Sequence, residues 1–393
     1  MKRIQCGLIL TAAALMIFAL GGGVAMAFHE GGVAHCDGCH TMHNSEDGES
    51  IIDGGVVGTA GAHLTLGADP GSTCLNCHQG TGSYHIFSND GSNLTPGGDF
   101  YWLTKTFTYT TFRPQTRNGY SFGHNVIAAD FGLERDPILT TAPGGTFPSA
   151  QLTCSSCHDP HGKKVNKTMQ IEESGSYRDN YDTFDPEALG NFRLLGDIGY
   201  EPGGGVTFTA GPPVATTAHY SRQSQTETDS NHTDYGSGMS EWCANCHTGF
   251  LSASVADHRH PASDSAGLNG DIISNYNEYV RTGDLTGTQG TAYFALVPFE
   301  RGTTDPLQTN PLSTEGPSGG NVACITCHRA HVSAFPNAGR WDFETELLAD
   351  SHPQDTDGGT QAGDQLASYY GRDIVAVYGP GQRSLCNKCH QQD

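Results

Sequence analysis

Twelve of the thirteen cysteines in this 393-residue chain fall into six copies of one pentapeptide, Cys-x-x-Cys-His. The copies begin at residues 36, 74, 154, 243, 324 and 386. Two thiols three residues apart on a turn can reach the two vinyl groups of one porphyrin, and the imidazole that follows then lies over the iron. The motif therefore predicts covalent attachment of haem c, six times along the chain.

The residues expected to hold six covalently bound haems c are defined by this motif. The attachment cysteines are Cys36, Cys39, Cys74, Cys77, Cys154, Cys157, Cys243, Cys246, Cys324, Cys327, Cys386 and Cys389, and the proximal iron ligands are His40, His78, His158, His247, His328 and His390. Other uses of paired cysteines fit less well. Zinc sites need no histidine directly after the second cysteine, and thioredoxin-like redox pairs do not occur in sixes. Disulfides are the usual role of an even cysteine count in an exported chain, but two residues separate every pair here.

Imidazole is the expected second ligand of each iron. Outside residues 1–27 the chain has three methionines, against thirteen histidines that lie outside the motifs. Two histidine ligands leave a haem iron saturated, with no open position for a substrate. This ligand supply favours electron transfer and predicts that the protein is not an enzyme.

Three motifs continue as Cys-His-x-x-His, and these doublets contribute His43, His161 and His331. Two imidazoles three residues apart cannot bind opposite faces of one porphyrin, because the two nitrogens must lie about 2 Å from the iron on either side. The second histidine of each doublet is therefore expected to serve a different haem. Three doublets in one chain predict a closely packed row of haems.

The other distal ligands are less constrained, because thirteen histidines compete for six positions. We expect His85, His124 and His260 to complete the distal set, with His29 as the alternative candidate. The remaining histidines lie in polar or glycine-rich segments without a pattern. They are expected to face solvent, and they are His35, His63, His219, His232, His258 and His352.

Regular secondary structure should be scarce. The chain has 52 glycines, its hydrophobic content is 36%, and turn-forming residues fill the segments between motifs. Apolar spacing predicts helices over residues 271–281 and 344–349, with short turns at the motifs, and alternation predicts a strand over 106–112. The expected fold class is mostly irregular loop with a few short helices and little strand. We expect a multihaem c-type cytochrome organised around a continuous haem chain, whose porphyrins would supply the apolar surface that the side chains lack.

Residues 1–27 have the pattern of a secretory signal peptide. Lys2 and Arg3 precede an apolar stretch of thirteen residues, and Ala25-Met26-Ala27 is a small-residue cleavage site. Residues 28–393 are then expected to form a single exported hexahaem unit. Removal of the signal leaves 18 basic against 42 acidic residues. This acidity excludes nucleic acid as a partner.

Longer strings around the motifs resemble the OmcS-type hexahaem c-type cytochromes, outer-surface proteins that polymerise into conductive filaments in metal-reducing bacteria. The strings are residues 28–34 with 36–43, 154–162, 239–247, 283–289, 369–372 and 385–390. The resemblance implies bis-histidine ligation of all six haems and haems stacked alternately parallel and T-shaped in one line. It also implies a head-to-tail homopolymer, in which His43 binds the haem of His328 in the next subunit.

Two functions fit these observations. The first is long-range extracellular electron transfer by a secreted, polymerising cytochrome at the outer cell surface. Its redox donors would lie in the periplasm or outer membrane, and its extracellular acceptors would be metal oxides or electrodes. The alternative is a monomeric soluble periplasmic shuttle, which needs six distal histidines within its own chain. A multihaem reductase is disfavoured, because it needs an open iron and usually a lysine in place of a motif histidine, and no motif here has one.

Overall fold

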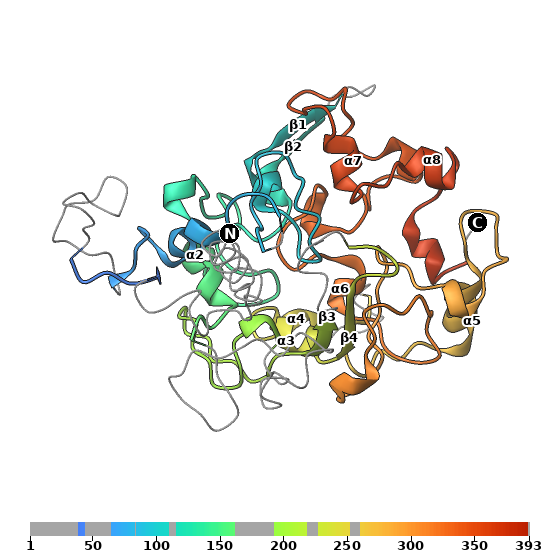
Figure 1. The fold of residues 1–393 in the computed structure, drawn as a ribbon, viewed down its shortest axis with the longest axis horizontal. Helices are drawn as coiled ribbons and strands as arrows, with labels where there is room; N and C mark the ends of the chain where they lie inside the picture. Colours follow the sequence, from blue (N-terminus) through green and yellow to red (C-terminus); the bar gives the residue numbers. More distant parts are fainter. Residues whose placement is uncertain are drawn as a thin grey trace, which may run out of the picture.

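Loops and short helices make up most of this protein. The structure, a computed structural model, describes residues 38–43, 64–82, 84–109, 115–161, 192–217, 227–251 and 260–391. No α-helix in these ranges exceeds nine residues, and none is long and apolar enough to cross a membrane. Figure 1 shows the short elements joined by long loops around the molecule. The predicted fold class is confirmed.

Several of the short helices carry the Cys-x-x-Cys-His motifs. The described α-helices are α2 (Pro70–His78), α3 (Met239–Cys243), α4 (Thr248–Leu251), α5 (Gly270–Glu278), α6 (Cys324–Cys327), α7 (Asp364–Ser368) and α8 (Ile374–Tyr378). Asp69 starts α2, because its side chain accepts a hydrogen bond from the Ser72 N–H and Pro70 suits the first turn. The predicted turns at the motifs are confirmed where the chain is described.

Single 3-10 turns complete much of the remaining structure. They are η3 (Phe100–Thr104), η4 (Gly119–Ser121), η5 (Ala129–Phe131), η6 (Ser149–Gln151), η7 (Cys154–Ser156), η9 (Phe192–Leu194), η12 (Gln289–Thr291), η13 (Pro306–Gln308), η14 (Pro336–Ala338), η15 (Leu348–Asp350) and η16 (Leu385–Lys388). Two of these turns, η7 and η16, hold the third and sixth motifs. The motif cysteines therefore lie on short helical turns rather than on long helices.

The predicted helix over residues 271–281 is present as α5, which ends three residues earlier. Asn269 caps it by accepting hydrogen bonds from the Asp271 and Ile272 N–H groups. The helix predicted over residues 344–349 is wrong. The backbone there pairs with another segment, because the Leu348 N–H donates to the Gln382 carbonyl and the Ser384 N–H donates to the Glu346 carbonyl. Only the turn η15 remains of that helix.

The described chain contains two sheets, each of two antiparallel strands. In the first, β1 (Thr106–Tyr109) pairs with β2 (Gln115–Asn118), and Phe107 and Tyr109 of β1 are buried between exposed threonines. The predicted strand is confirmed up to Tyr109, and residues 110–112 lie outside the described residues. The second sheet, in which β3 (Val214–Thr217) pairs with β4 (Thr233–Ser237), was not expected, because both strands are short and mostly polar.

Three small apolar clusters replace a single large core, and each contacts a motif. The first surrounds Leu296 and Trp341, and Cys327 and Cys389 pack against it. The second includes Leu75, which lies between the cysteines of α2. The third surrounds Tyr235 and Ile325 and contacts Cys243. The clusters thereby fix the positions of the attachment turns.

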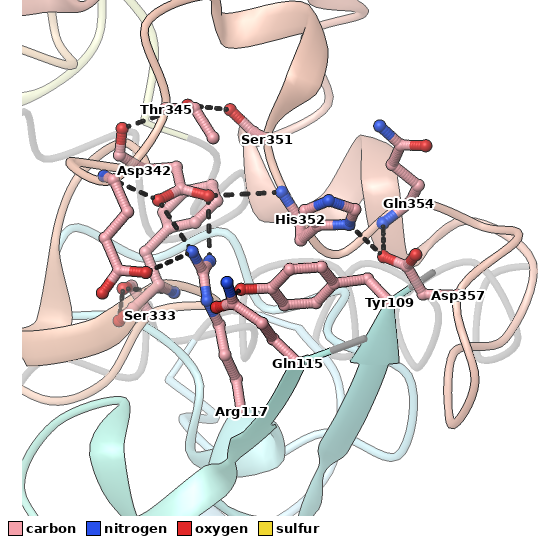
Figure 2. A network of polar contacts seen from close by, with 12 residues as sticks. Tyr109, Gln115, Arg117, Ser333, Asp342, Thr345, Ser351, His352, Gln354 and Asp357 are labelled. Carbon is pink, nitrogen blue, oxygen red and sulfur yellow. Dashed lines mark hydrogen bonds and ion pairs between the residues drawn. The ribbon is translucent and has the colours of Figure 1, made fainter. Parts of the chain in front are cut away.

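The prediction that His232 and His352 face solvent is wrong. His232 is 4% exposed and stacks on Tyr293, with ring centres 3.7 Å apart. His352 stacks on Tyr109 at 3.9 Å, and its Nδ1 lies 2.6 Å from a carboxylate oxygen of Asp357, as Figure 2 shows. Both rings are covered by tyrosines that are distant in the sequence. The other histidines expected to face solvent, His35, His63, His219 and His258, lie outside the described residues, as does His29.

Candidate haem-binding sites

All six motif histidines lie in the described chain, together with eleven of the twelve motif cysteines. Cys36 lies outside the described residues, as does the predicted signal peptide. Five of the six motifs are held by the elements α2, η7, α3, α6 and η16. In the first motif, His40 pairs with Thr65 in a β-bridge, which joins the segments 38–43 and 64–82.

In four of the motif histidines, the ring Nδ1 lies within hydrogen-bond distance of a backbone carbonyl oxygen. The Nδ1–O distances are 2.7 Å from His78 to Tyr84, 2.9 Å from His158 to Arg193, 2.8 Å from His247 to Pro143 and 2.8 Å from His328 to Asn337. A carbonyl oxygen can only accept a hydrogen bond, so the proton is on Nδ1 and the lone pair is on Nε2. A metal-binding histidine usually donates its other ring N–H to a carbonyl or carboxylate in this way, which fixes the orientation of the ring.

Four motif histidines also face a second imidazole at a nearly constant distance. The ring centres are 6.3 Å apart for His40 and His161, 6.2 Å for His158 and His331, 5.9 Å for His247 and His124, and 6.0 Å for His390 and His260. A ligating nitrogen lies about 2 Å from a bound metal and about 1 Å from its own ring centre. Two rings on opposite sides of one iron therefore have centres about 6 Å apart, as these four pairs do.

The two rings of a doublet face different partners. His158 faces His331, whereas His161, three residues later, faces His40. Each pair therefore draws its two rings from different parts of the chain. Within the described ranges no group of three histidine, cysteine or acidic side chains converges as a metal site. Paired imidazoles are instead the arrangement that a haem iron needs, since the porphyrin supplies the other four ligands.

Glycine-rich backbone holds His331 in place. Its N–H donates to the Gly97 carbonyl, and Val332 forms β-bridges with Gly98 and Gly123. Burial, with a smaller contribution from the neighbouring imidazoles, lowers the pKa of His331 to about 3. Burial likewise lowers the pKa of His124 to about 4, again with help from a neighbouring histidine. Both rings are therefore neutral near pH 7, as a metal ligand must be.

The remaining predicted ligands have different surroundings. The ring of His85 contacts that of Tyr84 in a tilted arrangement with ring centres 4.6 Å apart, and its buried Nδ1 has no hydrogen-bond partner among the described residues. The ring of His328 contacts Phe343 at 5.7 Å, and no histidine of the described chain faces it at the distance found in the four pairs. His43 is exposed at the end of the segment 38–43.

Cysteines of different motifs approach one another along the molecule. Cys74 lies close enough to Cys154 for their interaction to raise the pKa of Cys74, and Cys243 lies close to Cys324 in the same way. Cys157 of the third motif likewise lies near Cys246 of the fourth, and Cys327 of the fifth lies near Cys386 of the sixth. The attachment sites from the second motif to the sixth are thus consecutive neighbours in space.

No protein-family model matches the chain. The curated C-type cytochrome OmcS of Geobacter sulfurreducens is 40% identical to it over 437 aligned positions, which cover all of both proteins. This chain belongs to the family of OmcS-type c-type cytochromes. Two solved structures of OmcS filaments from the same organism agree in fold. The cryo-EM structure of the OmcS nanowires has a TM-score of 0.81 and 39% identity, and a second filament structure has a TM-score of 0.79 and 40% identity. Both match 93% of this chain and all of the solved chain.

The residues of this OmcS-type cytochrome fit haem c. The motif thiols lie on turns. In four motif histidines Nδ1 contacts a backbone carbonyl, so Nε2 is the nitrogen that can bind a metal. These carbonyl partners were not found from the sequence, because nothing local marks them. Sequence reasoning also missed the buried Arg329 and Arg340, which share Glu227 at 3.1 Å each. The position of Arg329 directly after His328 was the available signal.

Proposed function

We propose that this chain is a secreted multihaem c-type cytochrome that polymerises into a filament and carries electrons over long distances through a continuous chain of six haems. The observation that carries the proposal is the set of four imidazole pairs, with ring centres 5.9 to 6.3 Å apart. Each pair joins a motif histidine to a predicted distal histidine. The order of neighbouring motif cysteines supports a continuous row.

The ligand assignment follows from the pairs. His161 completes the iron site of His40, His331 that of His158, His124 that of His247, and His260 that of His390. His85, next to α2 in space, is assigned to the iron of His78, and His29 stays the alternative. The twelve motif cysteines, Cys36 included, form the thioether bonds.

The chain's own residues hold and insulate the electron carriers. When bound, each haem supplies a one-electron couple. The carbonyls of Tyr84, Arg193, Pro143 and Asn337 orient the proximal rings. Two histidines per iron leave no position for a substrate, so the protein transfers electrons without catalysing a reaction on a small molecule. The apolar clusters pack against one side of the attachment turns, at Cys243, Cys327 and Cys389.

We propose that polymerisation supplies the second ligand of the iron bound by His328. His328 faces no imidazole in the described chain, while His43 is exposed. In the head-to-tail filament, His43 of one subunit binds the iron of His328 in the next. The likeness to the OmcS nanowire structures favours this function over the periplasmic shuttle. A monomeric shuttle would have to complete that site within one chain.

Export accounts for the first 27 residues. Residues 1–27 are proposed to be a signal peptide cleaved after Ala27, and residues 28–393 to form one hexahaem unit. The solved filament chains match 93% of this chain, which is the share that residues 28–393 make up. The donors are redox proteins of the periplasm or outer membrane, and the acceptors are extracellular solids such as metal oxides or electrodes.

Electron microscopy of the secreted protein, with haem stoichiometry measured on the same sample, tests the function. We expect regular filaments with six haems per chain. Discrete monomers with six haems would overturn the filament and favour the shuttle. Fewer than six haems per chain would overturn the ligand assignment.

A further inference from the structure

Glu300 is a buried carboxylate between two haem-attachment helices. Its exposure is 0%, and its Oε1 accepts a hydrogen bond of 2.8 Å from the Met239 N–H at the start of α3. Its backbone pairs with Asn321, three residues before the first cysteine of α6. The Cys324 N–H in turn donates to Ser240 Oγ of α3. Glu300 therefore lies where the fourth and fifth motifs join.

The second carboxylate oxygen of Glu300 is not compensated. Glu300 Oε2 is buried and has no hydrogen-bond partner among the described residues, and the same holds for Glu241 Oε2. An unpaired buried charge is costly, because the interior screens it poorly. A proton on Glu300 removes that charge without any rearrangement of the fold.

The charged and titratable groups around Glu300 are mostly acidic. Glu241 of α3 and Asp264 repel it. The thiols of Cys243 and Cys324 also interact with it, and they become uncharged thioethers when haem is attached. Arg301 lies next to it in sequence, but its Nε is 3.0 Å from Asp234. Burial, followed by repulsion from Asp264 and Glu241, raises the pKa of Glu300 to about 8.

We propose that Glu300 is a redox-linked proton site, which takes a proton from solvent when the haems attached at the fourth and fifth motifs are reduced and returns it when they are oxidised. The inference rests on the proposed function, since it requires haems at His247 and His328. One electron from the filament's donor reduces an Fe(III) to Fe(II), and one proton from solvent converts the Glu300 carboxylate to a carboxylic acid.

The coupling follows from charge. Because Glu300 contacts α3 and the segment that leads into α6, haems attached there would lie near this buried carboxylate. Reduction would add one negative charge to such a haem, and the low dielectric of the interior would strengthen the repulsion between the two groups. Protonation of Glu300 therefore becomes more favourable on reduction. By reciprocity, protonation makes reduction more favourable by the same amount. The haems beside Glu300 are thus easier to reduce at pH 6 than at pH 9.

Spectroelectrochemical titration of the six-haem protein at several pH values tests the site. In the wild type, the midpoint potential of the affected haems is expected to fall as pH rises through about 8. Glu300→Gln should lose this part of the pH dependence. The control Glu346→Gln, whose side chain is 73% exposed, should keep it. An equal pH dependence in Glu300→Gln and wild type, with six haems in both, would overturn the proposal.

Infrared difference spectroscopy gives a second readout that needs only the wild type. Reduction at about pH 8.5 should produce a carboxylic acid C=O band that shifts in D2O. Its absence from the fully loaded wild type would overturn the proton site, even if Glu300→Gln does not fold. A haem count below six in the wild type would instead contradict the proposed function, so the two failures are distinguishable.

Discussion

Glu227 is a buried carboxylate that pairs with two buried arginines. It is 4% exposed, and its Oε1 lies 3.1 Å from Nη1 of both Arg329 and Arg340. Burial raises the pKa of Glu227, but the guanidinium groups of Arg329, Arg340 and Arg372 together outweigh burial and hold the pKa below its usual value. The carboxylate is therefore ionised throughout the neutral range. It compensates two cations directly beside the fifth motif.

We expect Glu227→Gln to destabilise the fold by about 3 to 5 kcal/mol, because it leaves two buried cations without an anion. The free energy of unfolding from chemical denaturation measures the effect. Glu344→Gln is the control, since Glu344 is 57% exposed although it pairs with Arg117 at 2.7 Å, and its loss should cost under about 1 kcal/mol. Because the folded pKa of Glu227 is lowered, its contribution is present above about pH 4.5 and is lost as pH falls. Equal losses in the two variants would contradict this account.

His232 makes the fold sensitive to acid in a different way. Both of its ring nitrogens are buried without a hydrogen-bond partner among the described residues. Burial lowers its pKa to about 3. Below pH 6.5 the unfolded chain binds a proton that the folded chain does not, so stability falls as pH falls toward 3. We expect the slope to approach 1.4 kcal/mol per pH unit.

His232→Phe should remove this slope and keep the stack on Tyr293. The free energy of unfolding of the variant, minus that of the wild type, should therefore grow as pH is lowered from 7 to 5. Thermal unfolding followed by circular dichroism at the two pH values measures it. A constant difference between the two proteins across this range would show that His232 gains a proton in the folded state.

Short pairings between loops decide where the distal ligands lie. Gly98 and Gly123 both form bridges to Val332, the residue after His331. Gly98 has a φ of +102°, and a Cβ there would lie 1.7 Å from the Val332 carbonyl oxygen. A side chain at this position must push the segment that carries His331 away. The position of the distal ligand His331 therefore requires a glycine at residue 98, which is far from His331 in the sequence.

Gly98→Ala is expected to displace His331 and leave one iron per chain without its second imidazole. Electron paramagnetic resonance of the ferric protein should then show one high-spin iron per chain. Gly132→Ala is the matched control, because Gly132 has a φ of +70° but a Cβ there would have nothing within 4 Å. This variant also places an alanine at a positive φ, but its low-spin spectrum should be unchanged. A low-spin spectrum in Gly98→Ala would contradict the role of this pairing.

The sequence predicted those elements whose signal is local. The apolar spacing of α5 and its cap Asn269 are both visible within one short segment. The region 344–349 has similar spacing, but its backbone hydrogen bonds go to residues 382–384, which no local pattern reveals. The same limit applies to His232, whose environment is made by Tyr293. The motifs were recognisable because covalent haem attachment needs residues at fixed spacing.

At the scale of the whole molecule, four of the six proposed iron sites are formed by two histidines that lie far apart along the chain. His40 faces His161, and His158 faces His331. Axial bonds would therefore tie the N-terminal and C-terminal thirds of the chain to the doublet in its middle third. Such cross-links would stabilise a chain that has only small apolar clusters and many loops. The site of His328 differs, since its ring contacts Phe343 and the Asn337 carbonyl and faces no second imidazole in the described chain.

His43→Ala is expected to give discrete monomers that still carry six haems and contain one high-spin iron per chain. The reason is that the substitution removes the proposed intersubunit ligand and leaves every attachment cysteine in place. Electron microscopy, haem stoichiometry and paramagnetic resonance on one sample measure the three effects. Met42→Ala is the matched control, because Met42 is the neighbouring residue and is 73% exposed, and it should still form filaments.

Added imidazole separates the loss of a ligand from the loss of a contact surface. If His43 acts as the ligand of His328 iron in the next subunit, imidazole should convert the high-spin iron of His43→Ala to low-spin. The protein should nevertheless stay monomeric, because free imidazole does not join two chains. Normal filaments in His43→Ala would exclude the intersubunit bond. A low-spin spectrum in its monomers without imidazole would mean that the iron of His328 finds its second ligand within the same chain.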